Sequence, residues 1–542
     1  MISIDPHSFF NLSLAEQKTI VRFLMPSFDS MLYSDRRNTL CHLFEQFGLG
    51  KCKNEIAEKL IEITRLCDVI PECHKPYRQI VHDGVLFFIS HISDERFMHM
   101  LAEQFLLDDE TTAQQRLLEL VKHMPTLHKL GQIIARNQNV DASFRKWLIH
   151  LENGLHSVTF QQIKESIDKE LSAFPESLAV RISPTILAEA SVAAVVPFVL
   201  SSDSQVSVDG VFKILKPHVR EYLYEELGIL DELARFYDNH RENYVLKDFP
   251  FVSTFEDVKT LLLREIEPSG EQENLRRASV FFEHESAVKI PQVLTLSTKT
   301  MTSMEQVYGW KVTDAPLTEQ EKRRCCKQIF RALIALPLFC LDQESFFHGD
   351  PHGGNIFAIK PQNHDQPRIA LLDWSLAGRL TRTQRHYVIR LCFAILTQQK
   401  QEIYNAVTAL AEIDLTNEPT LSNKIKVIIN KAFSGHSDYQ WVRKAFSLID
   451  TIATNGVRFP SDLLLFRKAV FTLEGILQEL DPEFDMDSYM MDFMTKLFVE
   501  ELPLRYWSVW FPLWDKSEHY KTLLSNTDLA LMLGRASLNS LL

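Results

Sequence analysis

Two short segments in the C-terminal half of this chain restrict its fold and chemistry more than any other feature. The first reads F-F-H-G-D-P-H-G-G-N-I-F over residues 346–357, and the second reads I-A-L-L-D-W-S-L-A-G-R-L over residues 369–380. An Asp, an Asn five residues later and a second Asp at the end of an apolar strand form a pattern typical of phosphoryl transfer. That reaction needs a carboxylate to orient or deprotonate the nucleophile, and hard oxygen ligands to hold Mg²⁺ against the phosphates.

Asp350 suits the role of the catalytic carboxylate, and Asn355 and Asp373 suit the role of metal ligands. The apolar strand before Asp373 would deliver this side chain rigidly into a cleft. A single Asp in a loop is more often a helix cap or turn former, but this combination of residues and spacing favours a site. His348 is predicted to pack or to bond to the backbone, and the same interpretation is open for His352.

Apolar residues at helical spacing predict that the chain begins with helices. Residues 1–110 have this spacing, few turn signals, and helix starts at Ser13 and Asp29. An amphipathic helix is predicted from Gln115 to Ile134, and another from Phe160 to Phe174, led by Thr159. The N-terminal part is therefore interpreted mainly as a helical scaffold.

Short runs of β-branched and aromatic residues predict strands in the middle of the chain. These runs are residues 195–199, 211–215, 288–294 and 300–307. Asp209-Gly210 is predicted to form a turn between strand-like pieces. From Glu319 onward the pattern is helical, except between Phe347 and Leu380. A small sheet-bearing lobe before a larger helical lobe predicts an α+β, protein-kinase-like bilobal fold with a helical N-terminal extension.

Composition restricts the partners and the location. The formal net charge of −13 argues against a nucleic-acid binder, because phosphate recognition draws on clustered Lys and Arg. None of the eight cysteines forms a Cys-x-x-Cys pair, so reduced core thiols are favoured over a structural zinc site. No run approaches the roughly 18 to 20 apolar residues that span a bilayer. The expectation is a reducing, cytoplasmic location, with any membrane contact peripheral.

A lysine upstream of the two Asp segments is a candidate phosphate ligand. The run V-F-K-I-L-K-P-H-V places Lys213 in a strand whose alternation would aim it into a cleft. A strand lysine that contacts phosphates needs a carboxylate to hold it, usually from a neighbouring helix. On spacing alone, the candidates are Glu265, Glu267, Glu271 and Glu273.

These segments resemble the UbiB/AarF family of atypical kinases, which is linked to ubiquinone and other lipid pathways. The catalytic loop of that family reads roughly H-x-D-P-H-P-G-N, and here the loop reads H-G-D-P-H-G-G-N. The lysine strand of the family, V-A-V-K-V-Q-R-P-G, is similar to residues 211–218 and matches Lys213. The helix motif E-L-D-F-x-x-E-A-x-N is similar to residues 265–274, which selects Glu271 as the partner of Lys213. The hinge resembles residues 302–305, and this implies that Met304 contacts the nucleotide.

Two features that separate this family from ordinary kinases have counterparts here. The K-x-G-Q motif is similar to residues 129–132; in the family this helical extension lies over the cleft and restrains protein phosphorylation. The resemblance therefore implies a regulatory role for Lys129 and Gln132. An Ala-rich loop replaces the usual glycine-rich loop and resembles residues 187–195, L-A-E-A-S-V-A-A-V. The nucleotide-binding residues implied in this loop are Ala188, Ala190 and Ser191.

The resemblance covers about residues 115–490 and includes a C-terminal helical segment, T-L-E-G-I-L-Q-E-L-D-P-E-F-D. The domains predicted are a helical region 1–110, a K-x-G-Q extension 111–180, a kinase-like N-lobe 181–307 and a helical C-lobe 308–542. Two departures from the family pattern matter. Asp-Phe-Gly becomes Asp373-Trp374-Ser375, which keeps the metal ligand and loses the glycine. Glu189 puts a carboxylate into the Ala-rich loop, where it would either repel nucleotide or face solvent.

The leading hypothesis is an atypical kinase or ATPase that binds Mg²⁺ with ATP or ADP and is connected to lipid or quinone metabolism. The alternative is a nucleotide-binding pseudokinase that acts as a regulatory or scaffold protein. A small-molecule kinase resembling aminoglycoside or choline kinases is a third idea, against which the Lys129 motif and the Ala-rich loop count. A lipid or a quinone-like small molecule is the expected further partner. The aromatic region Tyr506 to Trp514 is expected to pack against the C-terminal lobe rather than to dock on a bilayer or partner.

Overall fold

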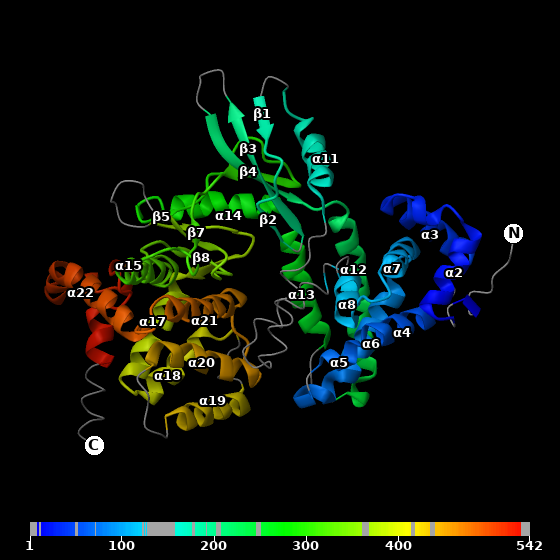
Figure 1. Ribbon diagram of the computed structural model, residues 1–542. Helices are drawn as coiled ribbons and strands as arrows, with labels where there is room; N and C mark the ends of the chain where they lie inside the picture. The colour runs from blue at the N-terminus through cyan, green and yellow to red at the C-terminus, as the bar shows by residue number, and fades with distance from the viewer. Residues whose placement is uncertain are drawn as a thin grey trace. The chain divides into compact units, whose positions relative to one another are not determined.

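The computed structural model describes most of the chain, and its residues form two compact units (Figure 1). The first unit comprises Met1–Pro268 and Leu296–Ser303, and the second comprises Ser269–Thr295 and Met304–Leu542. Lys129, Gln132 and Ser191, predicted as site residues, lie outside the described residues. The described residues are 8–9, 12–48, 52–70, 72–121, 124, 126, 158–175, 179–190, 192–201, 207–244, 251–359, 368–412, 418–433 and 440–532.

The first unit begins with the helical region that the sequence predicts. Its helices are α2 Leu14–Leu24, α3 Tyr33–Gln46, α4 Lys53–Thr64, α5 Leu66–Val69, α6 Arg78–His91, α7 Asp94–Leu106 and α8 Ala113–Val121, with 3₁₀ turns η1 Phe28–Ser30 and η3 Glu72–Tyr77. Ser13 starts α2 as predicted, through a capping box with Glu16. The helix start predicted at Asp29 is wrong, because this residue lies inside η1. Its carboxylate accepts a bond from Arg22 Nε at 2.9 Å instead of capping a backbone N–H.

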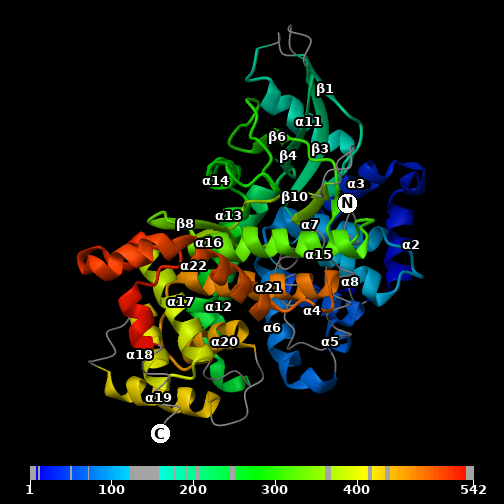
Figure 2. The same ribbon diagram turned by 90° about the vertical axis from the view of Figure 1, so that its left-hand side faces the viewer.

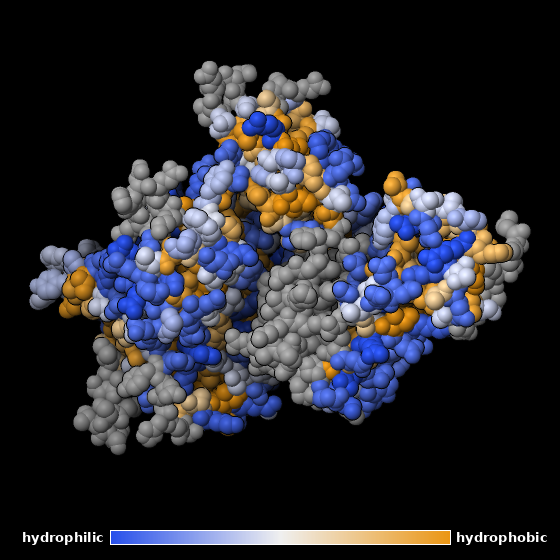
Figure 3. Space-filling model, in the orientation of Figure 1, coloured by the Kyte–Doolittle hydropathy of each residue, from blue (hydrophilic) through white to orange (hydrophobic). Residues whose placement is uncertain are grey.

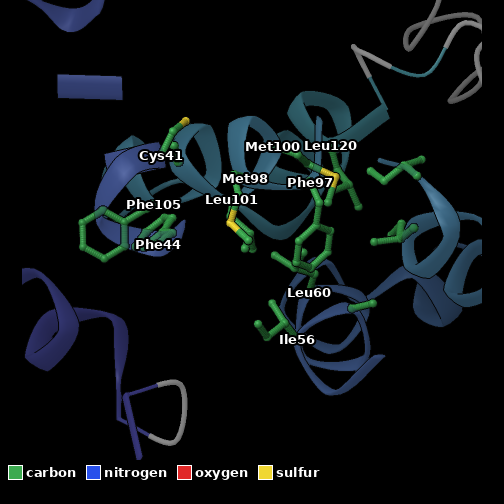
Figure 4. Packing of buried hydrophobic residues seen from close by; sticks show 14 of the residues in the cluster. Cys41, Phe44, Ile56, Leu60, Phe97, Met98, Met100, Leu101, Phe105 and Leu120 are labelled. Atoms are coloured by element: carbon green, nitrogen blue, oxygen red, sulfur yellow. The ribbon is translucent and has the colours of Figure 1, made fainter. Parts of the chain in front are cut away.

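A hydrophobic cluster holds these helices together (Figure 4). The ring of Phe97 on α7 points toward Leu60 of α4, and both residues are buried. Phe44 of α3 meets Phe105 of α7 edge to face, with the ring centroids 5.8 Å apart. Burying each such side chain contributes about 1.5–3 kcal/mol. Ile229, which lies outside the N-terminal helices on α12, belongs to the same cluster, so the helical region shares its core with the rest of the first unit.

A small sheet follows in the first unit. Its strands are β1 Ala179–Ile182, β2 Ala188–Glu189, β3 Ala193–Ser201, β4 Ser207–Leu215 and β6 Met301–Glu305, in the order β1-β3-β4-β6, with β2 paired to β3. The turn predicted at Asp209-Gly210 is wrong, because both residues lie inside β4 and pair with Val199 and Phe198. Packing explains this glycine: a Cβ at Gly210 would lie 2.4 Å from the Phe198 ring. Only glycine lets the strand pass this buried ring.

The remaining helices of the first unit flank this sheet. They are α11 Phe160–Leu171, α12 Val219–Asn239 and α13 Phe251–Glu265, with the 3₁₀ turn η4 Arg241–Asn243. Thr159 starts α11 as predicted, because its side chain caps the helix in a box with Gln162. The helix lies beside β4 (Figure 1). Glu170 near its end accepts a bond from the Thr298 hydroxyl at 2.6 Å.

The second unit is mainly helical and carries two further small sheets. Its strands β5 Val288–Lys289, β7 Trp310–Lys311, β9 Ile356–Ile359 and β10 Arg368–Leu371 pair in the order β5-β10-β9-β7, and β8 Glu344–His348 pairs with β11 Ala377–Thr381. The strand predicted over residues 288–294 forms only at its first two residues, with a single bridge from Val293 to Met304 further on. Pro291 explains the break, since proline has no N–H for a sheet ladder.

The helices of the second unit come before, between and after these strands in the sequence. They are α14 Pro268–Phe281, α15 Glu319–Phe330, α16 Leu336–Phe339, α17 Arg382–Leu396, α18 Lys400–Leu410, α19 Pro419–Ala432, α20 Trp441–Thr454, α21 Ser461–Leu480 and α22 Met486–Trp510, with the short π-helix η5 Arg331–Ala335 and the 3₁₀ turns η7 Pro512–Trp514 and η8 Ser517–His519. Figure 2 shows α15 running along α21, which it contacts. In the described part of the chain no helix is both long and apolar enough to cross a membrane. The α+β class is confirmed, and the four predicted domain ranges stay predictions.

The aromatic region at the end of α22 is largely exposed, so the prediction that it packs against the C-terminal lobe is wrong. Trp507, Trp510 and Leu513 are 55%, 67% and 87% exposed. Arg505 of the same helix is buried, and it forms an ion pair with Glu501 in which Nη2 and Oε2 are 2.6 Å apart. Orange patches lie over α22 at the left-hand edge of Figure 3. The aromatic surface is defined here as Tyr506, Trp507, Trp510, Phe511, Leu513 and Trp514.

Candidate active site

The two predicted metal ligands lie at the ends of paired strands in the second unit. Asn355 comes directly before β9, and Asp373 is the second residue after β10. The strands are antiparallel, with Leu371 opposite Ile356. The backbone N–H of Leu372 then donates to the Asn355 carbonyl at 2.8 Å. The pairing of β9 and β10 therefore brings Asn355 and Asp373 to the same end of the sheet.

The amide of Asn355 is oriented by the catalytic loop. Its Nδ2 donates to the carbonyl of Asp350 at 3.1 Å, and its backbone N–H donates to the carbonyl of His352 at 2.8 Å. Asn355 is 8% exposed. Because the amide nitrogen bonds to a protein carbonyl, Oδ1 is the atom that this side chain can offer to a metal. Together with the Asp373 carboxylate, this oxygen is a hard donor of the kind that Mg²⁺ prefers.

The backbone at Asp373 adopts a left-handed conformation, with φ at 53°. Such values are uncommon outside glycine, although Asp tolerates them better than most residues, and they recur at functional sites. The carboxylate accepts a bond from the backbone N–H of Ser375, from which its Oδ1 lies 3.3 Å. Asp373 therefore leaves the extended conformation of β10, and its carboxylate closes a turn on the backbone that follows.

Trp374 fixes the peptide that follows Asp373. Its side chain is fully buried, its Nε1 donates to the Leu371 carbonyl at 3.1 Å, and its ring stacks on Phe346 with centroids 5.5 Å apart. Asn274 of α14 donates from Nδ2 to the Trp374 carbonyl at 2.9 Å. The departure from Asp-Phe-Gly therefore places a structural anchor beside the metal ligand. The sequence interpretation missed Asn274, although this residue ends the helix motif that selected Glu271.

His348 connects the catalytic loop to the strand that carries Asp373. Its Nδ1 accepts a bond from the backbone N–H of Asp350 at 3.2 Å, which assigns the ring proton to Nε2. That Nε2 donates to the Leu372 carbonyl at 2.9 Å. Burial lowers the pKa of His348, which keeps the ring neutral. The prediction that this histidine bonds to the backbone is confirmed.

Asp350 lies beside a lysine that the sequence interpretation missed. Lys468 of α21 places Nζ 3.5 Å from Asp350 Oδ1, and His352 Nε2 lies 3.9 Å from Oδ2. The helix packs directly under the loop, because a Cβ at Gly349 would lie 2.9 Å from Leu465 Cδ2. No spacing rule connects residues so far apart in the sequence. The available signal was the position of Lys468 four residues before the T-L-E-G segment.

The predicted lysine and Ala-rich loop lie in the first unit. Lys213 in β4 is opposite Val195 in β3, which is opposite Ala188 in β2. The three residues therefore form a row across three strands. The loop closes tightly, with the N–H of Ala190 donating to the Ala193 carbonyl at 2.8 Å.

The sequence left open whether Glu189 would repel nucleotide or face solvent. In the structure its side chain is buried in an ion pair instead. Its carboxylate accepts an ion pair from Lys216, with Oε1 and Nζ 2.8 Å apart. The two side chains are only 4% and 9% exposed. Both sequence alternatives are wrong, because a lysine that follows β4 neutralises this carboxylate inside the unit.

Glu271 is the buried member of the four candidate carboxylates. It lies in α14 and is 5% exposed. Glu273 instead pairs with Arg277 at 2.7 Å on the exposed side of this helix. The ion pair between Lys213 and Glu271 stays a prediction. Met304, predicted at the nucleotide, is a buried residue of β6.

Comparisons with known proteins agree with this arrangement. The chain matches the ABC1 atypical kinase-like domain over residues 150–407 and the UbiB helical domain over residues 446–485. It is a kinase-like α+β protein, and the predicted fold class is confirmed. The second match contains Lys468, so the helical segment contributes a residue beside Asp350.

Known proteins match the chain at low sequence identity. An uncharacterized protein of Synechocystis, sll1770, is 24% identical over 380 residues, which are 69% of this chain and 63% of that protein. The probable protein kinase UbiB of Cellvibrio japonicus is 23% identical over 367 residues, or 67% of this chain and 65% of that protein. The chain thus spans just under two thirds of the length of each. A solved complex of Rv3197 with erythromycin from Mycobacterium tuberculosis has a TM-score of 0.38 and 14% identity, covering 61% of this chain and 86% of that chain. The chain belongs to the UbiB/AarF-type family of atypical kinase-like proteins.

Proposed function

We propose that this protein is an atypical kinase or ATPase that binds Mg²⁺ with ATP or ADP and is connected to lipid or quinone metabolism. The observation that carries the proposal is the placement of Asn355 and Asp373 at one end of a sheet by a backbone hydrogen bond of 2.8 Å between Leu372 and Asn355. Relatives named probable protein kinase UbiB support it. The expected cytoplasmic location stays a prediction.

Each candidate residue has a distinct role in this proposal. Asp350 orients the acceptor hydroxyl or water and takes its proton, while Asn355 Oδ1 and the Asp373 carboxylate hold the metal. Bound Mg²⁺ supplies charge neutralisation for the phosphates. Lys213 contacts the phosphates and Glu271 holds that lysine. The residues proposed to line the nucleotide are Ala188, Ala190, Ser191 and Met304, and those proposed to regulate access are Lys129 and Gln132.

The second candidate function is a nucleotide-binding pseudokinase with a regulatory or scaffold role. The buried Trp374 favours it, since a peptide held by Asn274 and by stacking on Phe346 has little freedom to rearrange after Asp373. Both functions predict metal-dependent nucleotide binding. They differ in phosphate release, which a pseudokinase lacks.

The test is a thermal-shift titration with ADP and ATP, with and without Mg²⁺. A ligand at a hundred times its dissociation constant stabilises the fold by about 2.7 kcal/mol. We expect metal-dependent stabilisation of the wild type, and its loss in Asp373→Ala. Asp350→Asn is the matched variant: it should keep nucleotide binding and lose phosphate release. The proposal would be refuted if neither ADP nor ATP changed the melting temperature of wild-type protein from which bound nucleotide had first been removed. Binding without phosphate release would favour the pseudokinase.

We also propose that the aromatic surface contacts a lipid bilayer peripherally. Trp and Tyr concentrate at membrane–water interfaces, where an apolar ring meets a hydrated tip. The charges at the edge of the surface are paired: Lys516 with Glu518, and Lys521 with Glu500 at 3.0 Å. A neutral rim suits zwitterionic headgroups better than anionic ones.

Co-sedimentation with phosphatidylcholine vesicles tests this contact. We expect the wild type to pellet with the vesicles at both low and high salt, and Trp507→Ser/Trp510→Ser to stay in the supernatant. Val280→Ser, at an exposed apolar residue of α14, is the matched control because Val280 is 73% exposed. Absence of wild-type binding, or equal binding by the double variant, would remove the proposal.

A further inference from the structure

The buried ion pair between Glu189 and Lys216 joins two segments that resemble family motifs, the Ala-rich loop and the lysine strand, at positions to which the resemblance gives no role. We propose that Lys216 is a positioning residue for the nucleotide: it neutralises Glu189 and holds the Ala-rich loop in the form that accepts phosphates. The proposal rests on the proposed nucleotide site. It assigns a task to a second lysine, three residues after Lys213.

Lys216 holds the loop from both sides. Its Nζ bonds to Glu189 of β2 at 2.8 Å, and its backbone N–H donates to the Val192 carbonyl at 2.9 Å. Between these two points, the N–H of Ala190 donates to the carbonyl of Ala193, the first residue of β3. One residue therefore fixes the hairpin where β2 ends and where β3 begins.

Burial makes the pair matter more than a surface ion pair. The side chains of Glu189 and Lys216 are 4% and 9% exposed, so water does little to screen either charge. Removing one partner of a buried pair leaves an uncompensated charge, which is far more costly than an exposed one. A lone Glu189 carboxylate would have to turn outward, beside the place where phosphates are proposed to bind. Its repulsion would then grow with the number of phosphates on the nucleotide.

The two lysines of this segment are not interchangeable. Lys213 lies within β4, opposite Val195, whereas Lys216 follows the last residue of that strand. Side chains alternate between the two faces of a strand, and these positions differ by an odd number. Lys213 and Lys216 therefore serve different faces of this segment, and Lys216 is the lysine that pairs with Glu189 and bonds to the loop.

Titration calorimetry with adenosine, ADP and ATP in the presence of Mg²⁺ tests the proposal on the full chain. We expect Lys216→Met to change adenosine affinity less than twofold, and to weaken ATP binding at least tenfold and ADP binding by less. Adding Glu189→Gln to Lys216→Met should return ATP affinity to within threefold of the wild type. Lys164→Met, which removes an exposed pair with Asp168 on α11, is the matched control and should change nothing.

Four results would overturn the proposal. If Lys216→Met weakened adenosine binding and ATP binding equally, the role of Lys216 would be merely structural. The same conclusion would follow if the double variant did not recover ATP affinity. If Lys216→Met does not fold, the exchanged pair Glu189→Lys/Lys216→Glu decides: retained ATP affinity supports positioning, and selective loss of ATP binding shows that Lys216 itself contacts phosphate. A wild type that binds neither ADP nor ATP would instead refute the nucleotide site, and this proposal with it.

Discussion

At the scale of single residues, the neutral ring of His348 joins the two loops of the candidate site. Protonating this ring would remove the acceptor that the Asp350 N–H uses, at Nδ1. Burial lowers the pKa of His348, whereas a histidine in the unfolded chain titrates at roughly pH 6.5. As pH falls through that value, the unfolded state gains a proton that the native state resists. The free energy of unfolding must therefore decrease toward acid pH.

We expect this residue to contribute a slope of up to about 1.4 kcal/mol per pH unit below roughly pH 6.5. Urea unfolding at about pH 7.5, 6.5 and 5.5, on either side of the ordinary titration range of histidine, measures this slope. His348→Asn should be less stable at neutral pH and should lack this part of the slope. His42→Asn is the control, at a histidine on α3 whose side chain is 79% exposed. Equal slopes for wild type and His348→Asn would contradict the prediction.

Lys468 supports the candidate catalytic carboxylate through an ion pair of 3.5 Å. We expect Lys468→Met to lower the rate of ATP hydrolysis about tenfold, because a misoriented base loses most of its effect, with nucleotide affinity changed less than twofold. Lys468→Arg should recover part of the rate. Arg467→Met is the neighbouring control, since Arg467 pairs with Asp450 at 2.7 Å. A shared fall in rate and affinity would indicate a structural role instead.

The prediction that His348 bonds to the backbone is confirmed in two ways, only one of which is local. The bond from the Asp350 N–H could be predicted because both residues lie in one loop, whereas the bond to the Leu372 carbonyl depends on a second segment of the chain. Lys468 and Lys216 could not be found in this way, because their partners lie elsewhere in the chain and only the pairing of elements brings them together. For Glu189 the sequence analysis left only two alternatives, repulsion of nucleotide or a side chain that faces solvent. The buried ion pair could not be predicted, because predicting it requires the register of the strands.

At the scale of elements, local capping signals predicted helix starts well, whereas the interiors of strands were predicted poorly. Ser13 and Thr159 start α2 and α11 through side chains only three residues from their partners. Asp209-Gly210 has the composition of a hairpin turn, and yet it lies inside β4. The reason is tertiary, because the absence of a Cβ at Gly210 makes room for the Phe198 ring on the neighbouring strand.

We expect Gly210→Ala to destabilise the fold by about 1–3 kcal/mol through overpacking. Phe198 cannot move aside cheaply, since it is buried and stacks on Phe212 with centroids 3.9 Å apart. Gly228→Ala is the control with opposite sign: this glycine of α12 has open space around it, and alanine should stabilise the helix by about 0.5–1 kcal/mol. Chemical denaturation measures both changes. If Gly210→Ala left the free energy of unfolding unchanged, close packing against Phe198 would not be the reason for this glycine.

At the scale of the whole molecule, the sequence predicted the α+β class and the helical N-terminal region, because both depend on periodicity over long stretches. It did not predict that this helical region belongs to the same compact unit as the first sheet. A buried charge network provides one link within that unit. Arg96 of α7 donates to Glu226 of α12, which is completely buried, and Glu226 also accepts from the Thr126 N–H at 2.8 Å.

We expect Arg96→Met to destabilise the first unit by about 3–5 kcal/mol, because it leaves the Glu226 carboxylate buried without its cation. Arg96→Met/Glu226→Gln should recover most of this loss, since an amide can still accept from Thr126 without carrying a charge. Arg22→Met, which removes an exposed pair with Asp29, is the control and should cost less than about 1 kcal/mol. Hydrogen exchange across α7 and α12 distinguishes local opening from global unfolding. If Arg96→Met raised exchange in α7 alone and left α12 protected, the N-terminal helices would be an independent attachment, and the network would not join them to the kinase-like part of the unit.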